Sequence, residues 1–112
     1  MKVAVIGSRG LTVDDLVSYL PPDVTEIVSG GARGIDTCAR LYAQKHGLRL
    51  TEFLPQYDRY PGRIAPLRRN DTIIAYADVV LAFWDGVSRG TKYVIDHCEK
   101  ENVPCRVILM RK

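Results

Sequence analysis

The chain has 112 residues, of which 46% are hydrophobic and 26% are charged, and its formal net charge is +3. This length suits one domain over residues 1–112 with a single hydrophobic core, and the composition excludes a disordered or fibrous protein. The charge suits anionic small molecules but is too weak to indicate nucleic-acid binding by itself.

The three cysteines have no C-x-x-C spacing, and the two histidines lie far apart. We therefore expect free cysteines in a reducing cytoplasm, with no disulfide framework, no metal site and no resident cofactor. The first residues read as a strand rather than as a basic and then apolar leader, and no apolar run reaches the roughly 18 residues of a membrane span. The sequence predicts a cytoplasmic protein that has no membrane partner.

The first half of the chain alternates apolar strand-like runs with helical patterns. In chain order, it predicts a strand over 3–6, a helix over 12–20, a strand over 26–29, a helix over 34–47 and a strand over 48–54. The first run is continuously apolar, as in a strand buried on both faces, whereas the run over 48–54 alternates and suits a sheet edge. Thr12 is the expected N-cap of the first helix, and Pro21-Pro22 ends it.

The second half opens with a loop and then continues the alternation. In chain order, it predicts a loop over 55–66, a helix over 67–77, a strand over 78–84, a helix over 90–103 that Pro104 ends, and a strand over 105–110. The runs over 3–6 and 78–84 are the most uniformly apolar. We expect these two strands at the centre of the sheet.

Five strands alternating with four helices predict an α/β fold, a three-layer α/β/α Rossmann-like sandwich with a five-stranded parallel sheet. With the first and fourth strands in the centre, the strand order is 3-2-1-4-5. In this order the chain reverses direction between the first and fourth strands. Ligands of open α/β sheets bind at such a switch point, beyond the carboxyl ends of the strands.

Four glycine-bearing turns, most of them with an arginine, punctuate the chain. They lie at residues 7–10, 29–36, 60–63 and 85–91, and are called here the first to fourth turns. Glycine lets backbone N–H groups approach a ligand, a helix N-terminus adds a positive dipole end, and arginine can bind phosphate through two hydrogen bonds. The pattern predicts a phosphorylated, nucleotide-like ligand, with the third turn as a candidate flap.

The candidate ligand-binding residues come from the first, second and fourth turns and from the third helix. They are Gly7, Ser8, Arg9, Ser29, Gly30, Gly31, Arg33, Gly34, Asp36, Arg69, Asn70, Asp85, Gly86, Ser88, Arg89, Gly90 and Thr91. Two of these assignments have a structural alternative to ligand binding. Asp36 has a purely capping or helix-dipole role as its alternative, and the hydroxyl of Ser88 or Thr91 has an N-cap role as its alternative. Neither a G-x-G-x-x-G fingerprint after the first strand nor a Walker A loop is present.

Asn70 is expected on the apolar face of the third helix, where a buried amide needs hydrogen-bond partners. Those partners are either backbone groups of a neighbouring glycine turn or the ligand, and both place Asn70 at the crevice. Tyr57, Tyr60 and Trp84 are candidates for stacking on a base or ribose. A core or subunit-interface position is the alternative for Trp84.

Four motifs occur in order along nearly the whole chain, namely Gly7-Ser8-Arg9, Ser29-Gly30-Gly31-Ala32-Arg33-Gly34-Ile35-Asp36, Arg69-Asn70 and Ser88-Arg89-Gly90-Thr91. They resemble the SLOG superfamily of Rossmann-like nucleotide-binding domains, which includes DprA, the LOG phosphoribohydrolases and the YspA/YpsA-like proteins. The small size is most similar to stand-alone YspA-type members. The resemblance implies a nucleotide-derived ligand, such as ADP-ribose, an NAD fragment or a nucleoside monophosphate, and a homo-oligomer.

LOG enzymes cleave the N-glycosidic bond of nucleoside 5′-monophosphates with a P-G-G-x-G-T-x-x-E motif. The corresponding stretch of this chain, residues 85–94, has Val94 at the glutamate position. Asp36, Asp71 and Asp85 are alternative acids, and the sequence does not choose among them. The catalytic residue is therefore unknown, and the resemblance implies binding more strongly than hydrolysis.

DprA-like proteins act on single-stranded DNA through a larger SLOG domain with accessory modules, for which this chain has no room. Its arginines could nevertheless follow a phosphate backbone. The main expectation is a cytoplasmic binding module, a sensor or carrier of a nucleotide-derived small molecule. An N-glycosidic hydrolase and a single-stranded nucleic-acid binder are the alternatives.

Overall fold

The computed structural model describes residues 1–111. Within these residues it contains five β-strands, three α-helices and one short 3-10 helix. In chain order, they are β1 (Lys2–Gly7), η1 (Leu16–Ser18), β2 (Glu26–Ser29), α1 (Ile35–Lys45), β3 (Arg49–Glu52), α2 (Ala65–Tyr76), β4 (Val79–Trp84), α3 (Arg89–Lys100) and β5 (Cys105–Leu109).

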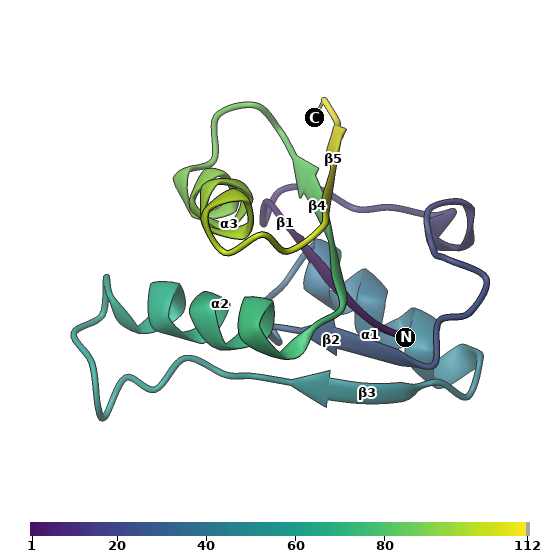
Figure 1. Cartoon of the computed structure of the whole chain (residues 1–112), viewed down its shortest axis with the longest axis horizontal. Coiled ribbons are helices and arrows are strands. Elements are labelled where there is room, and N and C mark those ends of the chain that lie inside the picture. The colour runs from purple at the N-terminus through teal and green to yellow at the C-terminus, as the bar shows by residue number, and fades with distance from the viewer. Residues whose placement is uncertain (112) are drawn as a thin grey trace.

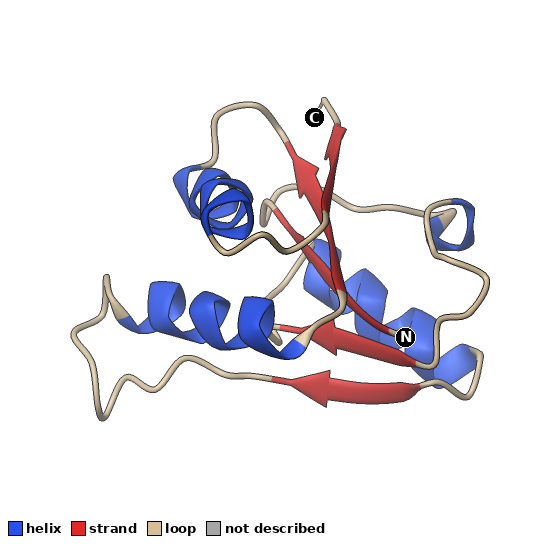
Figure 2. Ribbon diagram, viewed as in Figure 1, coloured by secondary structure: helices blue, strands red, loops and turns tan. Residues whose placement is uncertain are grey.

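All five strands form one parallel sheet with the order β3-β2-β1-β4-β5, as Figures 1 and 2 show. This confirms the predicted fold class and strand order. β1 lies between β2 and β4, and its pairing with β4 runs from Val3 opposite Val79 to Gly7 opposite Phe83. The switch point of the chain therefore lies between the carboxyl ends of β1 and β4.

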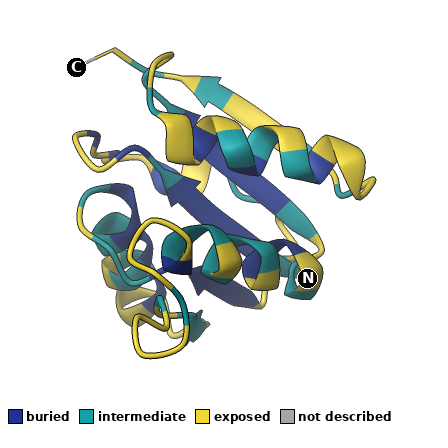
Figure 3. Ribbon diagram, turned by 90° about the vertical axis from the view of Figure 1, so that its left-hand side faces the viewer, coloured by how far each residue is buried: buried dark blue, intermediate teal, exposed yellow. Residues whose placement is uncertain are grey.

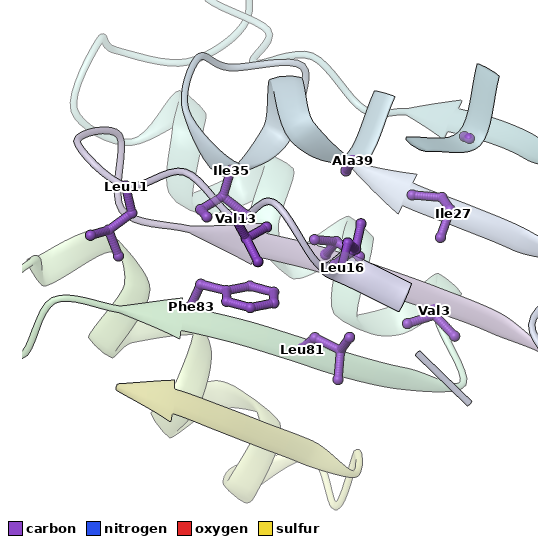
Figure 4. Packing of buried hydrophobic residues seen from close by; sticks show 11 residues of the cluster. Val3, Leu11, Val13, Leu16, Ile27, Ile35, Ala39, Leu81 and Phe83 are labelled. Carbon is purple, nitrogen blue, oxygen red and sulfur yellow. The ribbon is translucent and has the colours of Figure 1, made fainter. Parts of the chain in front are cut away.

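Helices cover both faces of the sheet, and each face has its own hydrophobic cluster. On one face, α1 and η1 pack against β1, β2 and β4, and Phe83, Ile27 and Ile35 are among the fully buried side chains of the cluster (Figure 4). On the other face, α2 and α3 contribute Ile73, Ile74, Val94 and Cys98, while the strands contribute residues such as Val80 and Ala82. Figure 3 shows buried central strands between helices with exposed outer sides, whereas the edge strands β3 and β5 are half-buried or exposed along their length. Burial of each large apolar side chain stabilises the fold by about 1.5–3 kcal/mol.

The first predicted helix, over residues 12–20, is wrong, because the structure has only the 3-10 turn η1 there. Asp15 precedes this turn with φ −113° and ψ 49°, outside the helical region, and its side chain makes no capping hydrogen bond. A segment this short, with β-branched and aspartate residues and a Pro-Pro stop, cannot repay the cost of helix nucleation. Leu11, Val13 and Leu16 are buried, but Val17 is exposed, so the side chains do not follow one helical face.

The other elements differ from the predictions only at their ends. α2 begins at Ala65 rather than at residue 67, with Pro66 in its first turn, where the missing N–H costs nothing. β3 ends at Glu52 and forms the sheet edge, as predicted, although Phe53 still donates its N–H to Ser29 at 2.9 Å. Across residues 1–111, no helix is long and apolar enough to cross a membrane.

Candidate functional site

A cleft of about 420 Å³ opens at the carboxyl ends of β1, β2 and β4, at the switch point. Its walls come from the first, second and fourth turns and from the N-terminal half of α2. The lining residues are Ile6, Gly7, Ser8, Arg9, Gly10, Gly30, Ala32, Asp36, Pro66, Leu67, Arg69, Asn70, Asp85, Ser88, Gly90, Thr91 and Val94. The structure thus brings together candidate residues from three turns that are far apart in the sequence.

Three hydroxyl groups gather where α3 begins. The Oγ1 atom of Thr91 lies 3.4 Å from the Oγ atoms of both Ser8 and Ser88, and Ser8 and Thr91 are buried. Among residues 1–111, no side chain caps α3, so the alternative N-cap role of the Ser88 or Thr91 hydroxyl is not realised. Within the described chain, the N–H groups of Gly90 and Thr91 also have no acceptor, as is usual for the first turn of a helix. Hydroxyl and N–H donors therefore converge on one side of the cleft.

The fourth turn is held by Asp85 and Trp84. One carboxylate oxygen of Asp85 accepts the N–H groups of Val87 at 3.0 Å and Ser88 at 2.8 Å. The indole N–H of Trp84 donates to the carbonyl of Ser88 at 3.0 Å. Trp84 does not line the cleft, so its indole supports the turn and is not placed to stack on a ligand there.

Asp36 lies opposite α3, in the first turn of α1, and its side chain lines the cleft although the residue is only 7% exposed. Its Oδ2 atom accepts the N–H of Ala32 at 3.0 Å. Burial raises the pKa of this carboxyl, while the hydrogen bond from Ala32 and the charge of Arg69 act in the other direction. Asp36 thus makes a hydrogen bond that holds the second turn, and its carboxyl group also lines the cleft.

Arg69 projects from α2 to the second turn. Its Nη1 atom donates to the carbonyl of Gly30 at 2.5 Å and lies 3.5 Å from that of Phe53. Its Nε atom is buried and has no hydrogen-bond partner among residues 1–111. Burial lowers the pKa of Arg69, the charge of Arg9 lowers it further, and Asp36 opposes both effects. A guanidinium in a fixed orientation is ready to donate an additional hydrogen bond.

Asn70 lines the cleft as predicted, but it does not bind a glycine turn. Its neighbour Arg69 makes that contact instead, through the carbonyl of Gly30. In the described part of the chain, the carboxamide of Asn70 makes no hydrogen bond. Its donors and acceptor therefore remain available to a molecule in the cleft.

Comparison with known proteins identifies a relative of nearly equal length. The chain is 36% identical over 115 residues to the Gene 61 protein of Mycobacterium phage D29, and the match covers 92% of each chain. The chain belongs to the Gene 61 protein family. No protein-family model matches the chain, and no solved structure matches it. The name Gene 61 protein states no ligand and no activity, so the cleft itself has to indicate the function.

Six candidate residues of this Gene 61 family member lie outside the cleft, namely Ser29, Gly31, Arg33, Gly34, Gly86 and Arg89. Ser29 is fully buried, and its hydroxyl accepts the N–H of Gly31 at 3.4 Å. Gly34 has φ +76°, and a Cβ atom there would collide with the backbone carbonyl of Arg9 and come within 2.9 Å of that of Leu11. These two residues shape the turn rather than contact a ligand, while the side chain of Arg89 is exposed.

The remaining candidates of the second turn, Gly31 and Arg33, line a neighbouring cavity together with Tyr57. Tyr60 lines a third cavity, beside α2, which the first and fourth turns do not reach. The proposed flap role of the third turn has no counterpart in the cleft walls, which do not include residues 60–63. Of these two tyrosines, Tyr57 is therefore the one that lines a cavity sharing Arg9, Gly30 and Ala32 with the cleft.

The three aspartates that the sequence could not rank have different surroundings. Asp71 does not line the cleft, and its Oδ1 accepts the hydroxyl of Tyr93 at 2.7 Å. Asp85 lines the cleft, but its Oδ1 holds the fourth turn. Asp36 is the buried one of the two that line the cleft. The geometry thus favours Asp36 as the carboxyl group that can act on a bound molecule.

Sequence reasoning missed the apolar part of the cleft, which Leu67 and Val94 provide. Helical spacing could have predicted both residues. Leu67 lies three residues before Asn70 and Val94 lies three residues after Thr91, so each shares a helical face with a candidate residue. Within residues 1–111, no three His, Cys, Asp or Glu side chains lie close enough together to hold a metal ion.

Proposed function

We propose that this protein binds a nucleotide or nucleotide-derived small molecule in the cleft, as a sensor or carrier module in the cytoplasm. Nucleoside monophosphates and ADP-ribose or NAD-derived compounds are the candidate ligands. The observation that carries the proposal is a convergence of donors. The N–H groups of Gly90 and Thr91, which have no acceptor within residues 1–111, lie beside the hydroxyls of Ser8, Ser88 and Thr91.

This convergence suits a phosphoryl group. The N-terminus of α3 presents backbone donors and the positive end of the helix dipole, which typically stabilises an anion by about 0.3–1 kcal/mol. The hydroxyls can rotate to donate to the remaining phosphate oxygens. Arg9, which is exposed and lines the cleft, supplies a positive charge nearby.

The rest of the cleft suits a sugar and a base. The carboxyl group of Asp36 can accept a hydrogen bond from a ribose hydroxyl, and the carboxamide of Asn70 can pair with polar groups of either sign. Leu67 and Val94 form an apolar surface for a ring. A pocket with an apolar wall and a few convergent polar groups is typical of small-molecule sites.

A thermal-shift panel of nucleoside monophosphates, ADP-ribose and NAD tests the proposal. A compound at 100 times its Kd should stabilise the folded protein by about 2.7 kcal/mol and raise its Tm. Thr91→Val should reduce the shift, while Thr12→Val, at an exposed threonine that does not line the cleft, is the matched control. The proposal is wrong if no compound raises the Tm and a single-stranded oligonucleotide is retained at low salt instead.

A second candidate function, N-glycosidic hydrolysis of a bound nucleotide, is favoured by the raised pKa of the buried Asp36 carboxyl. A protonated Asp36 would give its proton to the base nitrogen as the bond from that nitrogen to C1′ breaks. Water would add to C1′ and return a proton to the carboxylate, leaving free base and a ribose phosphate. The environment of Asp36 is suited to such acid catalysis.

Chromatography of each nucleotide after incubation with the protein tests for hydrolysis. Free base should appear with wild-type protein, and Asp36→Asn should reduce its release at least about 100-fold, as expected for loss of a general acid. Asp14→Asn, at an exposed position two residues before η1, is the control. If every compound that raises the Tm is recovered intact, the protein only binds.

We also propose that the protein forms a homo-oligomer through the β5 edge of the sheet. Val107 and Leu109 on this edge strand are 43% and 66% exposed. Edge strands with exposed apolar side chains favour pairing with another chain. Light scattering should show a mass above 12.6 kDa that Leu109→Lys returns to the monomer value.

A further inference from the structure

A second cavity of about 450 Å³, called here the side cavity, adjoins the cleft. Its side-chain walls are Arg9, Arg33, Tyr57 and Arg69, and the backbone of residues 30–32 forms its floor. Arg9, Gly30, Ala32 and Arg69 line the cleft as well. A molecule that fills the cleft can therefore extend past Arg69 into the side cavity.

The side cavity has a one-sided charge. Three guanidinium groups line it, and none of its lining residues is a carboxylate. The cleft, by contrast, includes Asp36 and Asp85, and the third cavity includes Glu52, Asp58 and Asp71. Asp36 offsets part of the charge of Arg69 from the cleft side, but no carboxylate lines the side cavity itself, so a bound anion would reduce the repulsion among the three guanidinium groups.

Arg69 carries a second, independent sign of an absent partner. Its Nε–H group is buried and unpaired among residues 1–111, although its Nη1 atom is held by the carbonyl of Gly30. A buried donor without an acceptor costs about 1–3 kcal/mol. The guanidinium is thus already oriented by the backbone, and its Nε–H group still lacks an acceptor that an oxygen of a ligand would provide.

We infer that the side cavity binds a second phosphoryl group of the same ligand, so that the natural ligand is a nucleotide with two phosphoryl groups rather than a monophosphate. This inference rests on the proposed nucleotide-binding function. One phosphoryl group lies against the N-terminus of α3, and the other lies among Arg9, Arg33 and Arg69. The ring of Tyr57, which is 58% exposed, offers a stacking surface for the part of the ligand beyond it.

Two ligand types carry this chemistry. In one, the phosphoryl groups are linked to each other, as in a nucleoside diphosphate or its ribosyl ester. In the other, they are separated by the sugar, as in a nucleoside 3′,5′-bisphosphate. Both types need the same guanidinium groups, and comparison of their affinities tells them apart.

Calorimetric titration at fixed ionic strength tests the inference, with AMP, ADP, ADP-ribose and adenosine 3′,5′-bisphosphate as probes and their uridine counterparts as a second series. At least one probe with two phosphoryl groups should bind about tenfold more tightly than the monophosphate, because charge-assisted hydrogen bonds add to its affinity. Arg33→Gln should abolish this advantage and leave the Kd of the monophosphate unchanged. Arg33 is exposed and makes no hydrogen bond in residues 1–111, so the variant should keep the wild-type Tm.

Arg106→Gln, on β5, is the matched control and should behave as wild type. Equal affinities for the monophosphates and all probes with two phosphoryl groups overturn the inference and leave the proposed function standing. An advantage that survives Arg33→Gln overturns it too. Absence of binding by every probe overturns the inference together with the proposed function.

Discussion

Two buried carboxyl groups lie near opposite ends of β2, and their surroundings differ. Glu26, at the amino end, is 6% exposed and accepts hydrogen bonds from Tyr76 at 2.6 Å and Thr51 at 2.7 Å. The hydrogen bond from Tyr76 is the main cause that lowers its pKa. Asp36, beyond the carboxyl end, is 7% exposed, and burial raises its pKa.

The two carboxyl groups differ in their hydrogen-bond donors. Side chains of this protein donate to Glu26, whereas a backbone N–H donates to Asp36. Around Glu26, side chains of β3 and α2 supply the donors, and Arg49 lies 3.9 Å away. Around Asp36, the partner is a backbone N–H, and the nearby Arg69 and Asn70 also have unused hydrogen-bonding groups. Among residues 1–111, the buried side-chain atom that lacks a partner, the Nε of Arg69, lies at the carboxyl end of the sheet, which is where a ligand is expected.

The most damaging change for the carboxyl end is Gly34→Ala. A Cβ atom at this position would meet backbone carbonyls of the first turn, and φ is +76°. We expect a loss of about 3 kcal/mol, from steric overlap together with left-handed strain. Gly47→Ala is the matched control, since its φ is +66° but a Cβ atom would meet nothing within 4 Å. Chemical denaturation should give it only about 1 kcal/mol of destabilisation, and equal losses would contradict the proposed overlap.

A change at the amino end should have a smaller, pH-dependent effect. Tyr76→Phe removes the hydrogen bond that lowers the pKa of Glu26. Because the folded-state pKa lies below its ordinary value of 4.5, the stabilisation is present above pH 4.5 and disappears as the pH falls through the folded-state value. Thermal unfolding should therefore separate wild type from the variant at pH 7 more than at pH 3. Tyr42→Phe is the control, and a gap that does not depend on pH would rule out the Glu26 contact as the cause.

Asp36→Asn should have the smallest effect on stability, and of the opposite sign. Burial penalises the charged form of Asp36, so its contribution to stability is greatest when it is protonated and falls as the pH rises through its raised pKa. The amide oxygen of asparagine can still accept the N–H of Ala32, and we expect a gain of up to about 1 kcal/mol at pH 7. Denaturation at pH 7 measures it. A clear loss would mean that the ionised carboxylate is a structural partner, as Glu26 is.

Periodicity and turn chemistry predicted the sheet well, because uniformly apolar runs such as residues 3–6 and 78–84 leave few alternatives to central parallel strands. They failed over residues 12–20, where apolar spacing imitated a helix that is too short to form. The spacing of apolar residues says nothing about the free-energy cost of forming the first turn of a helix.

The site was predictable at the level of turns and less so at the level of side chains. Strand order alone brings the first, second and fourth turns to one edge. The reach of Arg69 across to Gly30, which the sequence suggested for Asn70, depends on side-chain length and helix rotation. The partners of Glu26 were equally hidden, since Thr51 and Tyr76 come from elements that only the folded sheet places beside it.

The contact between Arg69 and the main chain limits how this position can vary among relatives. One guanidinium nitrogen binds the carbonyl of Gly30 while a different nitrogen remains to be satisfied. Lysine has the same charge but carries its donors on a single atom, so it cannot bind the carbonyl of Gly30 and also present a donor on a second nitrogen. We therefore expect lysine to be rejected at position 69 even though it preserves the charge, in contrast to Arg89 on the exposed start of α3, where an exchange for lysine should be accepted. An evolutionary record of the two positions would show whether selection acts on the charge of the cleft or on the geometry of its donors.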